Sequence, residues 1–197
     1  MMINSLFNAP VSIYAGVRDV RGVQTTVGEF MRRRAYDYLD GDEKRALPCI
    51  TVGGQFHRRK LGELIAPSGV VQLDFDAKDN VGADWQMMKL ALSQVDGLEV
   101  YTAISASGNG VFALFHVPFL LDIYERQGEP AYLQAHRNYT QTLARHFYDE
   151  CGYVADGSCI NRPNGLRFVS ADDAPIHANA PEVNLHDQQL VAEVVAA

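Results

Sequence analysis

The stretch from Val70 to Asp76 limits the fold more than any other part of this sequence. It reads Val-Val-Gln-Leu-Asp-Phe-Asp and stays largely apolar on both alternating faces until its last residues. A strand of this kind needs cover on both faces, so we expect it in the middle of a covered sheet. The rest of the chain must therefore supply further strands, and helices that pack against them.

Three segments have helical patterns. Residues 84–95 and residues 130–150 repeat apolar side chains every three or four positions, which is the spacing of a helix with one buried face. A third helix is expected to begin at Thr26, whose spacing to Glu29 fits a capping box, and to continue to about Leu39. The apolar stripe of the longest helix consists of Tyr132, Ala135, Tyr139, Leu143 and Phe147.

Strands are expected between and after these helices. Residues 49–52 contain several β-branched side chains and end at a Gly-Gly turn. Residues 98–105 and 111–117 flank a Ser-Gly-Asn-Gly turn and predict a hairpin. Two short strands are expected at residues 153–155 and 166–170.

The order of these elements predicts an α+β fold with a mixed β-sheet flanked by helices. We expect residues 1–175 to form one domain. Residues 176–197 are expected to be a C-terminal tail or the start of a linker, because the composition turns to Ala, Pro, Asn and His beyond Asp173. A short helix is expected from Asp187.

The amino-acid composition excludes several classes of protein. In 197 residues, a hydrophobic content of 47% is enough for a sizeable core. The apolar runs are too short to span a bilayer and the N-terminus lacks a signal-peptide pattern, so we expect a cytoplasmic protein without a membrane partner. The three irregularly spaced cysteines indicate neither a disulfide framework nor a zinc site. A net charge of −7 argues against a protein that coats nucleic acid by charge alone, although basic residues 32–34 and 57–60 offer local phosphate contacts.

Asp74 and Asp76 end the apolar strand and are two residues apart. Both carboxylates therefore point to the same face, with Cα atoms roughly 6 to 7 Å apart. Oxygen ligands at this spacing suit Mg²⁺ or Mn²⁺, and a pair of such ions can activate an attacking oxygen and stabilise the leaving one. The alternative interpretation is that the strand runs out into solvent, where aspartates are common.

Two further groups of residues suit phosphate binding. The hairpin turn presents small residues and backbone N–H groups, as a phosphate-binding loop does, although Asn-Gly is also an ordinary hairpin turn. Asp156 is followed closely by Arg162 and Arg167, which would either pair with this carboxylate or bind a triphosphate through their forked donors. The turn residues that would lie at a bound phosphate are Ser107, Gly108, Asn109 and Gly110.

Together these segments resemble the archaeo-eukaryotic primase superfamily, and most closely its VirE N-terminal-like branch, which is found in replication proteins of bacterial mobile elements. The resemblance runs from about Val11 to Ala180. Four elements in the family's order carry it: LPCITVGGQF (47–56), SGVVQLDFD (68–76), SASGNG (105–110) and RFVSAD (167–172).

The resemblance implies a primase-polymerase architecture with an RRM-like catalytic core. It also implies template-dependent nucleotidyl transfer (DNA primase/polymerase activity) in the replication of a bacterial mobile element, phage or plasmid, with Mg²⁺ or Mn²⁺ as the cofactor. The partners would be a single-stranded DNA template, nucleoside triphosphates and a helicase domain or protein. By the same resemblance, Asp74, Asp76 and Asp156 would hold the metal ions, while Arg162, Arg167 and the turn backbone would contact the phosphates.

The sequence departs from the family's pattern at Phe112. Where the family carries a histidine or a lysine, an apolar ring removes a charge-assisted contact to the triphosphate. His116 shares this face but lies about 13 Å further along the strand. A non-catalytic nucleic-acid-binding replication domain is therefore an alternative. A metal-dependent nuclease, which could use the same pair of aspartates, is another. We also expect Asp74→Ala to leave stability unchanged or raised, because clustered carboxylates without a metal repel each other.

Overall fold

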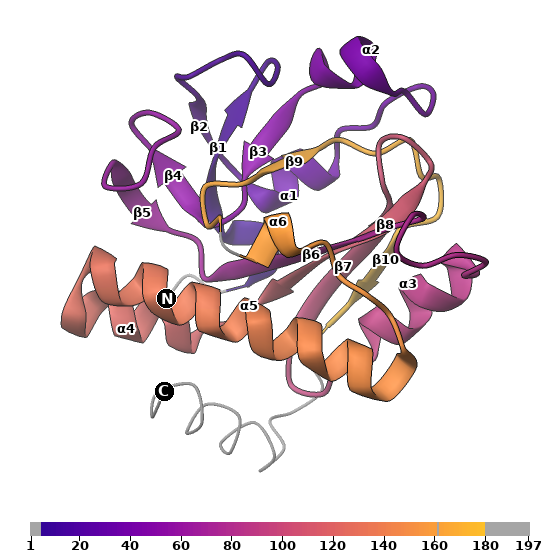
Figure 1. Cartoon of the computed structure of the whole chain (residues 1–197). Coiled ribbons are helices and arrows are strands. Elements are labelled where there is room, and N and C mark those ends of the chain that lie inside the picture. Colours follow the sequence, from indigo (N-terminus) through magenta and orange to yellow (C-terminus); the bar gives the residue numbers. More distant parts are fainter. Residues whose placement is uncertain (1–4, 161, 180–197) are drawn as a thin grey trace.

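The computed structural model describes residues 5–160 and 162–179, and its described strands form three antiparallel sheets flanked by helices (Figure 1). The first sheet has the order β2 (Val23–Thr26), β1 (Pro10–Tyr14), β3 (Cys49–Thr51) and β9 (Leu166–Phe168). The second sheet has the order β10 (Ile176–Ala178), β7 (Glu99–Ile104), β8 (Gly110–His116) and β6 (Val70–Asp76). The third is the hairpin of β4 (Gly54–Phe56) and β5 (Leu64–Pro67). The α+β class is confirmed, and its strands are divided over these sheets rather than joined in one mixed sheet.

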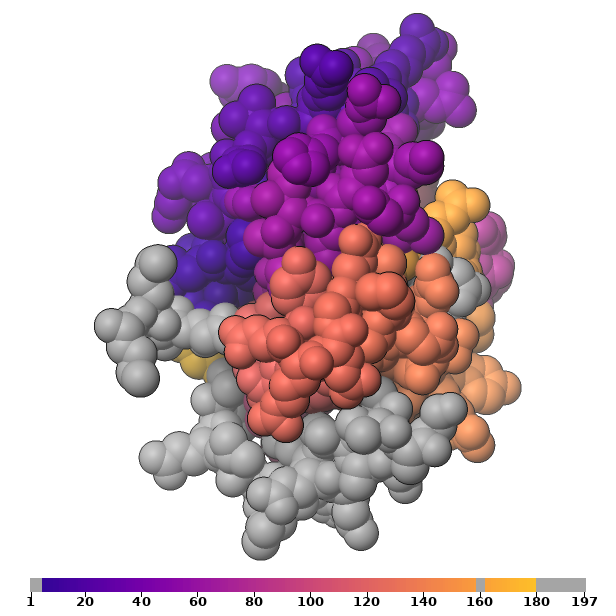
Figure 2. Space-filling view, turned by 90° about the vertical axis from the view of Figure 1, so that its left-hand side faces the viewer, coloured from indigo at the N-terminus to yellow at the C-terminus, as the bar shows by residue number. Residues whose placement is uncertain are grey.

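Three helices lie against one face of the second sheet, namely α3 (Trp85–Ser93), α4 (Phe119–Gln127) and α5 (Glu129–Cys151). Figure 1 shows α5 running across this sheet with α4 beside it and α3 towards β7 and β10. The shorter helices are η1 (Leu6–Asn8), α1 (Val27–Met31), α2 (Gly41–Arg45) and α6 (Gly157–Ile160). On the side shown in Figure 2, the surface of α4 and α5 continues into that of the β4–β5 hairpin, where the Gly62 N–H donates to Glu129 Oε1 at 3.0 Å.

The two faces of β6 belong to two different cores, because successive strand residues point in opposite directions. Val71, Leu73 and Phe75 pack with the helices. Val70 packs with the opposite core, which lies between the second sheet and the first sheet. Phe112 of β8 belongs to this inter-sheet core and is 1% exposed. The even-numbered face of β6, which carries Asp74, is therefore turned towards the first sheet.

The bounds of β6 are confirmed, but its place in the sheet differs from the prediction. It is an edge strand that pairs with β8 alone among the described strands, rather than a middle strand. Apolar side chains on both faces report that both faces are covered, here by helices and by the first sheet. Apolar side chains give no information about how many strands pair with the backbone of β6.

Several other predicted elements are confirmed. The β7–β8 hairpin pairs in antiparallel register around the predicted turn. The stripe predicted for the longest helix is buried on α5. In α3, the Asp84 carboxylate accepts hydrogen bonds from the first-turn N–H groups of Gln86 and Met87, which explains the start of this helix.

The helix predicted from Thr26 to Leu39 is much shorter. Thr26 caps α1 by accepting from the Glu29 N–H at 3.3 Å, but the helix ends at Met31. Beyond Phe30 the positions that would continue the buried stripe are Arg34 and Asp37, so no apolar face remains to stabilise a longer helix.

The strand predicted at residues 153–155 is wrong. The Asn80 side chain forms hydrogen bonds with the backbone of Val154 instead. Asn80 Oδ1 accepts from the Val154 N–H, and Asn80 Nδ2 donates to the Val154 carbonyl oxygen, both at 2.9 Å. A side-chain amide thus replaces the ladder that a strand would form.

The second sheet extends past residue 175, because β10 pairs with β7. The short helix expected from Asp187 lies outside the described residues. Within residues 5–160 and 162–179, no helix has both the length and the hydropathy needed to cross a membrane.

Candidate functional site

A small hollow lies where edge strand β6 of the second sheet meets edge strand β9 of the first. It has a volume of about 200 Å³, and four of the residues predicted from the sequence line it. We call it the carboxylate hollow. Its lining consists of Gln72, Asp74, Asp156, Ser158, Arg162, Gly165, Leu166 and Arg167.

Asp74 and Arg167 form an ion pair across the two sheets. Arg167 Nη2 lies 2.9 Å from Asp74 Oδ2, and the two side chains are 6% and 19% exposed, respectively. Arg167 Nε also donates to Gln72 Oε1 at 3.1 Å, and the guanidinium carbon lies 4.7 Å from the centre of the Phe112 ring. Arg167 is therefore fixed by three neighbours and holds Asp74 in place.

Asp156 is brought to Asp74 by the backbone. Its N–H donates to the Asp74 carbonyl oxygen at 2.7 Å, and its carboxylate accepts from the N–H of Ser158 at 3.0 Å and from the hydroxyl at 2.7 Å. Burial alone would raise the pKa of Asp156. The hydrogen bonds from Ser158 and the charges of Lys78 and Arg167 outweigh this effect and lower the pKa, so the carboxylate stays ionised.

Asp76 does not line the carboxylate hollow. Its carboxylate lies 3.4 Å from Lys78 Nζ, in an ion pair that is largely open to solvent. Hydrogen bonding and charge interaction with Asp76, together with the charges of Asp79 and Asp156, raise the pKa of Lys78. The predicted pair of aspartates thus splits, with Asp74 facing Arg167 and Asp76 facing Lys78.

The predicted phosphate-binding turn lies beside Asp76 but also outside the carboxylate hollow. The Asn109 carbonyl oxygen accepts from the Ala77 N–H at 3.0 Å. The Gly108 N–H is already used within the turn, where it donates to Ser105 at 2.9 Å. Gly108 has φ +74°, and a Cβ there would lie 3.1 Å from the Tyr38 ring, so Tyr38 covers this side of the turn.

Arg162 connects the carboxylate hollow to a second hollow of about 510 Å³. We call this second hollow the arginine groove. Arg162 is exposed, and its loop is held against the first sheet because the Gly53 N–H donates to the Pro163 carbonyl oxygen at 2.9 Å. Among the described residues, the groove is lined by Val17, Arg59, Leu61, Arg162, Asn164, Gly165 and Leu166, none of which carries a carboxylate.

The carboxylates have the chemistry that Mg²⁺ or Mn²⁺ requires, since these ions prefer oxygen ligands. Asp74 Oδ1 is buried and accepts no hydrogen bond within the described part of the chain, so its capacity to bind a donor or a cation is unused. Among residues 5–160 and 162–179, no group of three or more His, Cys, Asp or Glu side chains is arranged as a metal site. The shared metal triad of Asp74, Asp76 and Asp156 stays a prediction.

Phe112, His116 and Asp172, which ends the RFVSAD segment, are all buried. Phe112 is a core residue, and His116 is 3% exposed, with a pKa that burial lowers. Asp172 is buried against Lys89, with Oδ2 and Nζ 2.7 Å apart, and it also accepts from the N–H groups of Ile104 and Ala174.

Sequence reasoning missed Gln72, Lys78 and Ser158. Gln72 alternates with Asp74 and Asp76 along β6, so strand periodicity would have placed it on the same face. Lys78 lies in the turn after β6, where strand periodicity gives no signal. Ser158 stands two residues after Asp156, which is the spacing at which an aspartate side chain bonds the following backbone.

Comparison with protein families gives a match between residues 42–162 and the family model described as "BT4734-like, N-terminal domain". No curated protein and no solved structure matches the chain. The matched residues include Asp74, Asp156 and Arg162 of the carboxylate hollow and end before Arg167.

Proposed function

We propose that this chain, which belongs to the BT4734-like N-terminal domain family, catalyses template-dependent nucleotidyl transfer with Mg²⁺ or Mn²⁺, as a primase-polymerase does. The observation that carries the proposal is the lining of the carboxylate hollow. Two carboxylates and two arginines from three separate stretches of the chain converge there. Carboxylates for a divalent ion, one arginine that orients a carboxylate and one exposed arginine for phosphates are groups that a site for a metal-bound nucleoside triphosphate requires.

Each residue of the site has a role in this proposal. Asp74 and Asp156 hold the metal ion, because one or two carboxylates together with substrate phosphates are a usual ligand set for Mg²⁺. Arg162 is exposed and binds the triphosphate. Arg167 positions Asp74 rather than binding phosphate, since its guanidinium is already held by Asp74 and Gln72. In this proposal Asp76 is a further ligand of the metal ion, and it binds the ion when its ion pair with Lys78 breaks.

The reaction joins a nucleotide to the 3′ end of a strand. The 3′ hydroxyl oxygen attacks the α-phosphorus, the bond from that phosphorus to the bridging oxygen breaks, pyrophosphate leaves, and the hydroxyl proton passes to solvent. The divalent ion, when bound, neutralises phosphate charge and favours ionisation of the attacking hydroxyl. The arginine groove carries the backbone of the nucleic acid, because it opens from the same hollow and Arg59 supplies positive charge to its lining.

Asp156→Asn tests the proposal most cleanly. Asparagine caps a helix about as well as aspartate, so the contacts to Ser158 are retained while the charge is lost. We expect the variant to fold normally and to lose incorporation of labelled nucleotide on a single-stranded template with Mn²⁺. The matched control is Asp122→Asn, an exposed position on α4. Wild-type incorporation in the Asp156→Asn variant would contradict the assignment.

A second candidate function is that of a non-catalytic nucleic-acid-binding domain. The structure offers one observation in its favour, since Phe112 is buried where the resemblance expects a cation. This candidate gains support if the wild-type protein binds single-stranded DNA but incorporates no nucleotide with either metal. Shortening of the labelled strand in the same assay would indicate the nuclease instead.

A further inference from the structure

A third hollow, of about 470 Å³, lies at the end of β9 opposite the carboxylate hollow. Leu166 and Arg167 at the start of β9 line the carboxylate hollow, whereas Val169, just after β9, lines the third one. We call it the tyrosine pocket. Its volume is in the range of sites that bind small ligands. The pocket is lined by Arg33, Arg34, Ala35, Tyr36, Asp37, Leu39, Leu47, Pro48 and Val169.

The segment that carries Tyr36 is fixed on both sides. The Ala35 N–H donates to the Ser170 carbonyl oxygen at 2.9 Å, and the Leu39 N–H donates to the Ala106 carbonyl oxygen at 2.8 Å. Ala35 itself is buried in the inter-sheet core. Between these anchors the side chain of Tyr36 is fully exposed. Because the backbone is already held in place, little further conformational freedom of the backbone is lost when a ligand binds to the exposed ring.

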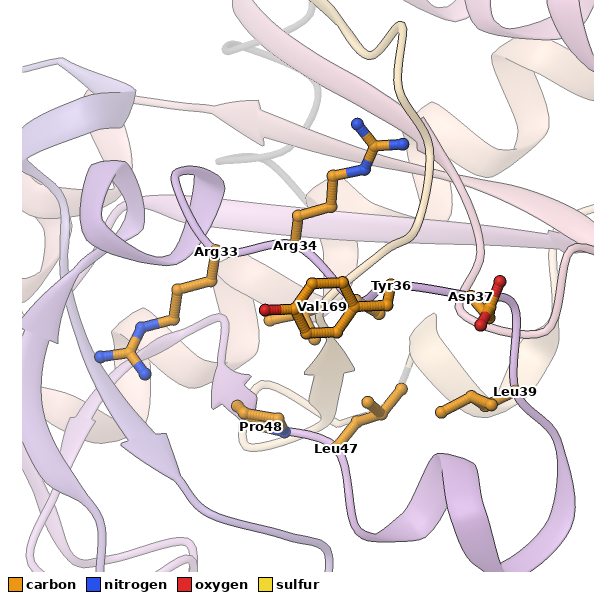
Figure 3. A pocket seen from close by; sticks show the side chains of 9 residues that line it. Arg33, Arg34, Tyr36, Asp37, Leu39, Leu47, Pro48 and Val169 are labelled. Atoms are coloured by element: carbon orange, nitrogen blue, oxygen red, sulfur yellow. The ribbon is translucent and has the colours of Figure 1, made fainter.

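The groups around the ring combine apolar surface with positive charge. Figure 3 shows Arg33 and Arg34 pointing to opposite sides of Tyr36, with Leu47 and Pro48 along the lower rim. Arg34 Nε donates to the Ala171 carbonyl oxygen at 3.2 Å, which leaves its terminal nitrogens for a ligand. Within residues 5–160 and 162–179, the Arg33 side chain makes no hydrogen bond or ion pair. This local positive charge stands out in a chain with a net charge of −7.

We propose that the tyrosine pocket binds one base of a single-stranded nucleic acid, which stacks on Tyr36 while Arg33 and Arg34 contact the flanking phosphates. An aromatic ring accepts the face of any base, and arginines beside it neutralise the backbone. The bases of a duplex are already stacked on each other, so only a single strand offers a free face. Asp37 also lines the pocket, and its carboxylate can accept hydrogen bonds from exocyclic amino groups of the base. This binding requires neither a metal ion nor nucleotidyl transfer.

Two labelled oligodeoxynucleotides of equal length separate stacking from charge. One carries bases, and the other has abasic sugars on the same phosphate backbone. Fluorescence anisotropy in EDTA then measures binding of each strand to the full chain. We expect Tyr36→Ala to weaken binding of the strand with bases about five- to a hundredfold and to leave the abasic strand unaffected. Tyr36→Trp keeps an aromatic ring at this position and should bind the strand with bases about as well as the wild type does.

Arg33→Ala should weaken binding of both strands and reduce the slope of log affinity against log salt by about one. The matched controls are Tyr148→Ala, an exposed tyrosine on α5, and Arg126→Ala, an exposed arginine on α4. The proposal would be overturned if Tyr36→Ala bound each of the two strands as tightly as the wild type does. A dimer of the chain that Tyr36→Ala dissociates would also overturn it, because the pocket would then bind a second copy.

Discussion

Asp74 is both a proposed metal ligand and the ion-pair partner of a nearly buried arginine. We therefore expect Asp74→Ala to destabilise the fold by about 1 to 3 kcal/mol, since Arg167 loses a charged partner that water cannot fully replace. This reverses the expectation from the sequence that the change is neutral or stabilising. Asp74→Asn keeps an acceptor for Arg167 and should cost less. Urea unfolding of both variants measures the difference, and a Asp74→Ala protein as stable as wild type would contradict this role of the pair.

Phe112 has a structural role at the position where the resemblance expects a cation. It is 1% exposed, and its ring lies beneath the Arg167 guanidinium. Phe112→Lys would bury an amine next to that guanidinium, so we expect a loss of several kcal/mol of stability and no gain in nucleotide affinity. Phe112→Leu is the apolar control and should cost less. Thermal unfolding and nucleotide titration of the two variants check this. Tighter nucleotide binding by a stable Phe112→Lys protein would place residue 112 in the site after all.

At the scale of single residues, the sequence was informative where chemistry and spacing coincide. Asp74, Asp156 and Arg162 could be assigned to one site because acids and arginines recur in a recognisable order, and the structure places them around one hollow. The ion pair between Asp74 and Arg167 could not be predicted. It depends on how two sheets meet, and strand alternation within one segment contains no information about this.

At the scale of elements, α5 docks on β6 through a buried histidine. The His136 ring nitrogen Nε2 lies 2.9 Å from the Val70 carbonyl oxygen, and burial, together with the charge of Arg137, lowers the pKa of His136 to about 4. In the unfolded chain its pKa is about 6.5, so the unfolded state takes up the proton first as the pH falls. Stability should therefore decrease from pH 6.5 to about pH 4, by roughly 3 kcal/mol from this residue.

His136→Gln removes the titration but can still donate to the Val70 carbonyl oxygen. Urea unfolding at several pH values should give a flatter stability profile for this variant between pH 6.5 and 4. The buried His116 titrates in the same direction and leaves part of the slope. An unchanged slope in the variant would show that His136 is not held neutral.

The boundaries of helices and strands were predicted well where a long apolar stripe is buried. They were predicted poorly where the hydrogen bonds of a single side chain determine the local structure. The stripe of α5 and the alternation of β6 each extend over many residues, so the sequence shows them clearly. The segment at residues 153–155 is apolar enough for a strand, but one distant asparagine, Asn80, takes its hydrogen bonds. No local pattern reports such a contact.

At the scale of the whole molecule, the proposed ligand site lies between the two large sheets, so a ligand there stabilises their association. At a hundred times its dissociation constant, a nucleoside triphosphate with Mn²⁺ should add about 2.7 kcal/mol of stability and raise Tm by about 5 to 10 °C. EDTA should remove the gain. Differential scanning calorimetry of the wild type and of Asp156→Asn tests this, and an equal rise in both proteins would contradict metal binding at Asp156.

The position of Arg167 has a consequence for any fragment of this chain that is cut to the matched residues. The family match ends at residue 162, so a boundary drawn there passes through the middle of the carboxylate hollow. Asp74, Asp156 and Arg162 fall inside the boundary, and the arginine that orients Asp74 falls outside it. A fragment cut to the matched residues would also leave Phe112 without the strand that covers its face. For this chain, the folded unit that completes the carboxylate hollow extends at least to β9.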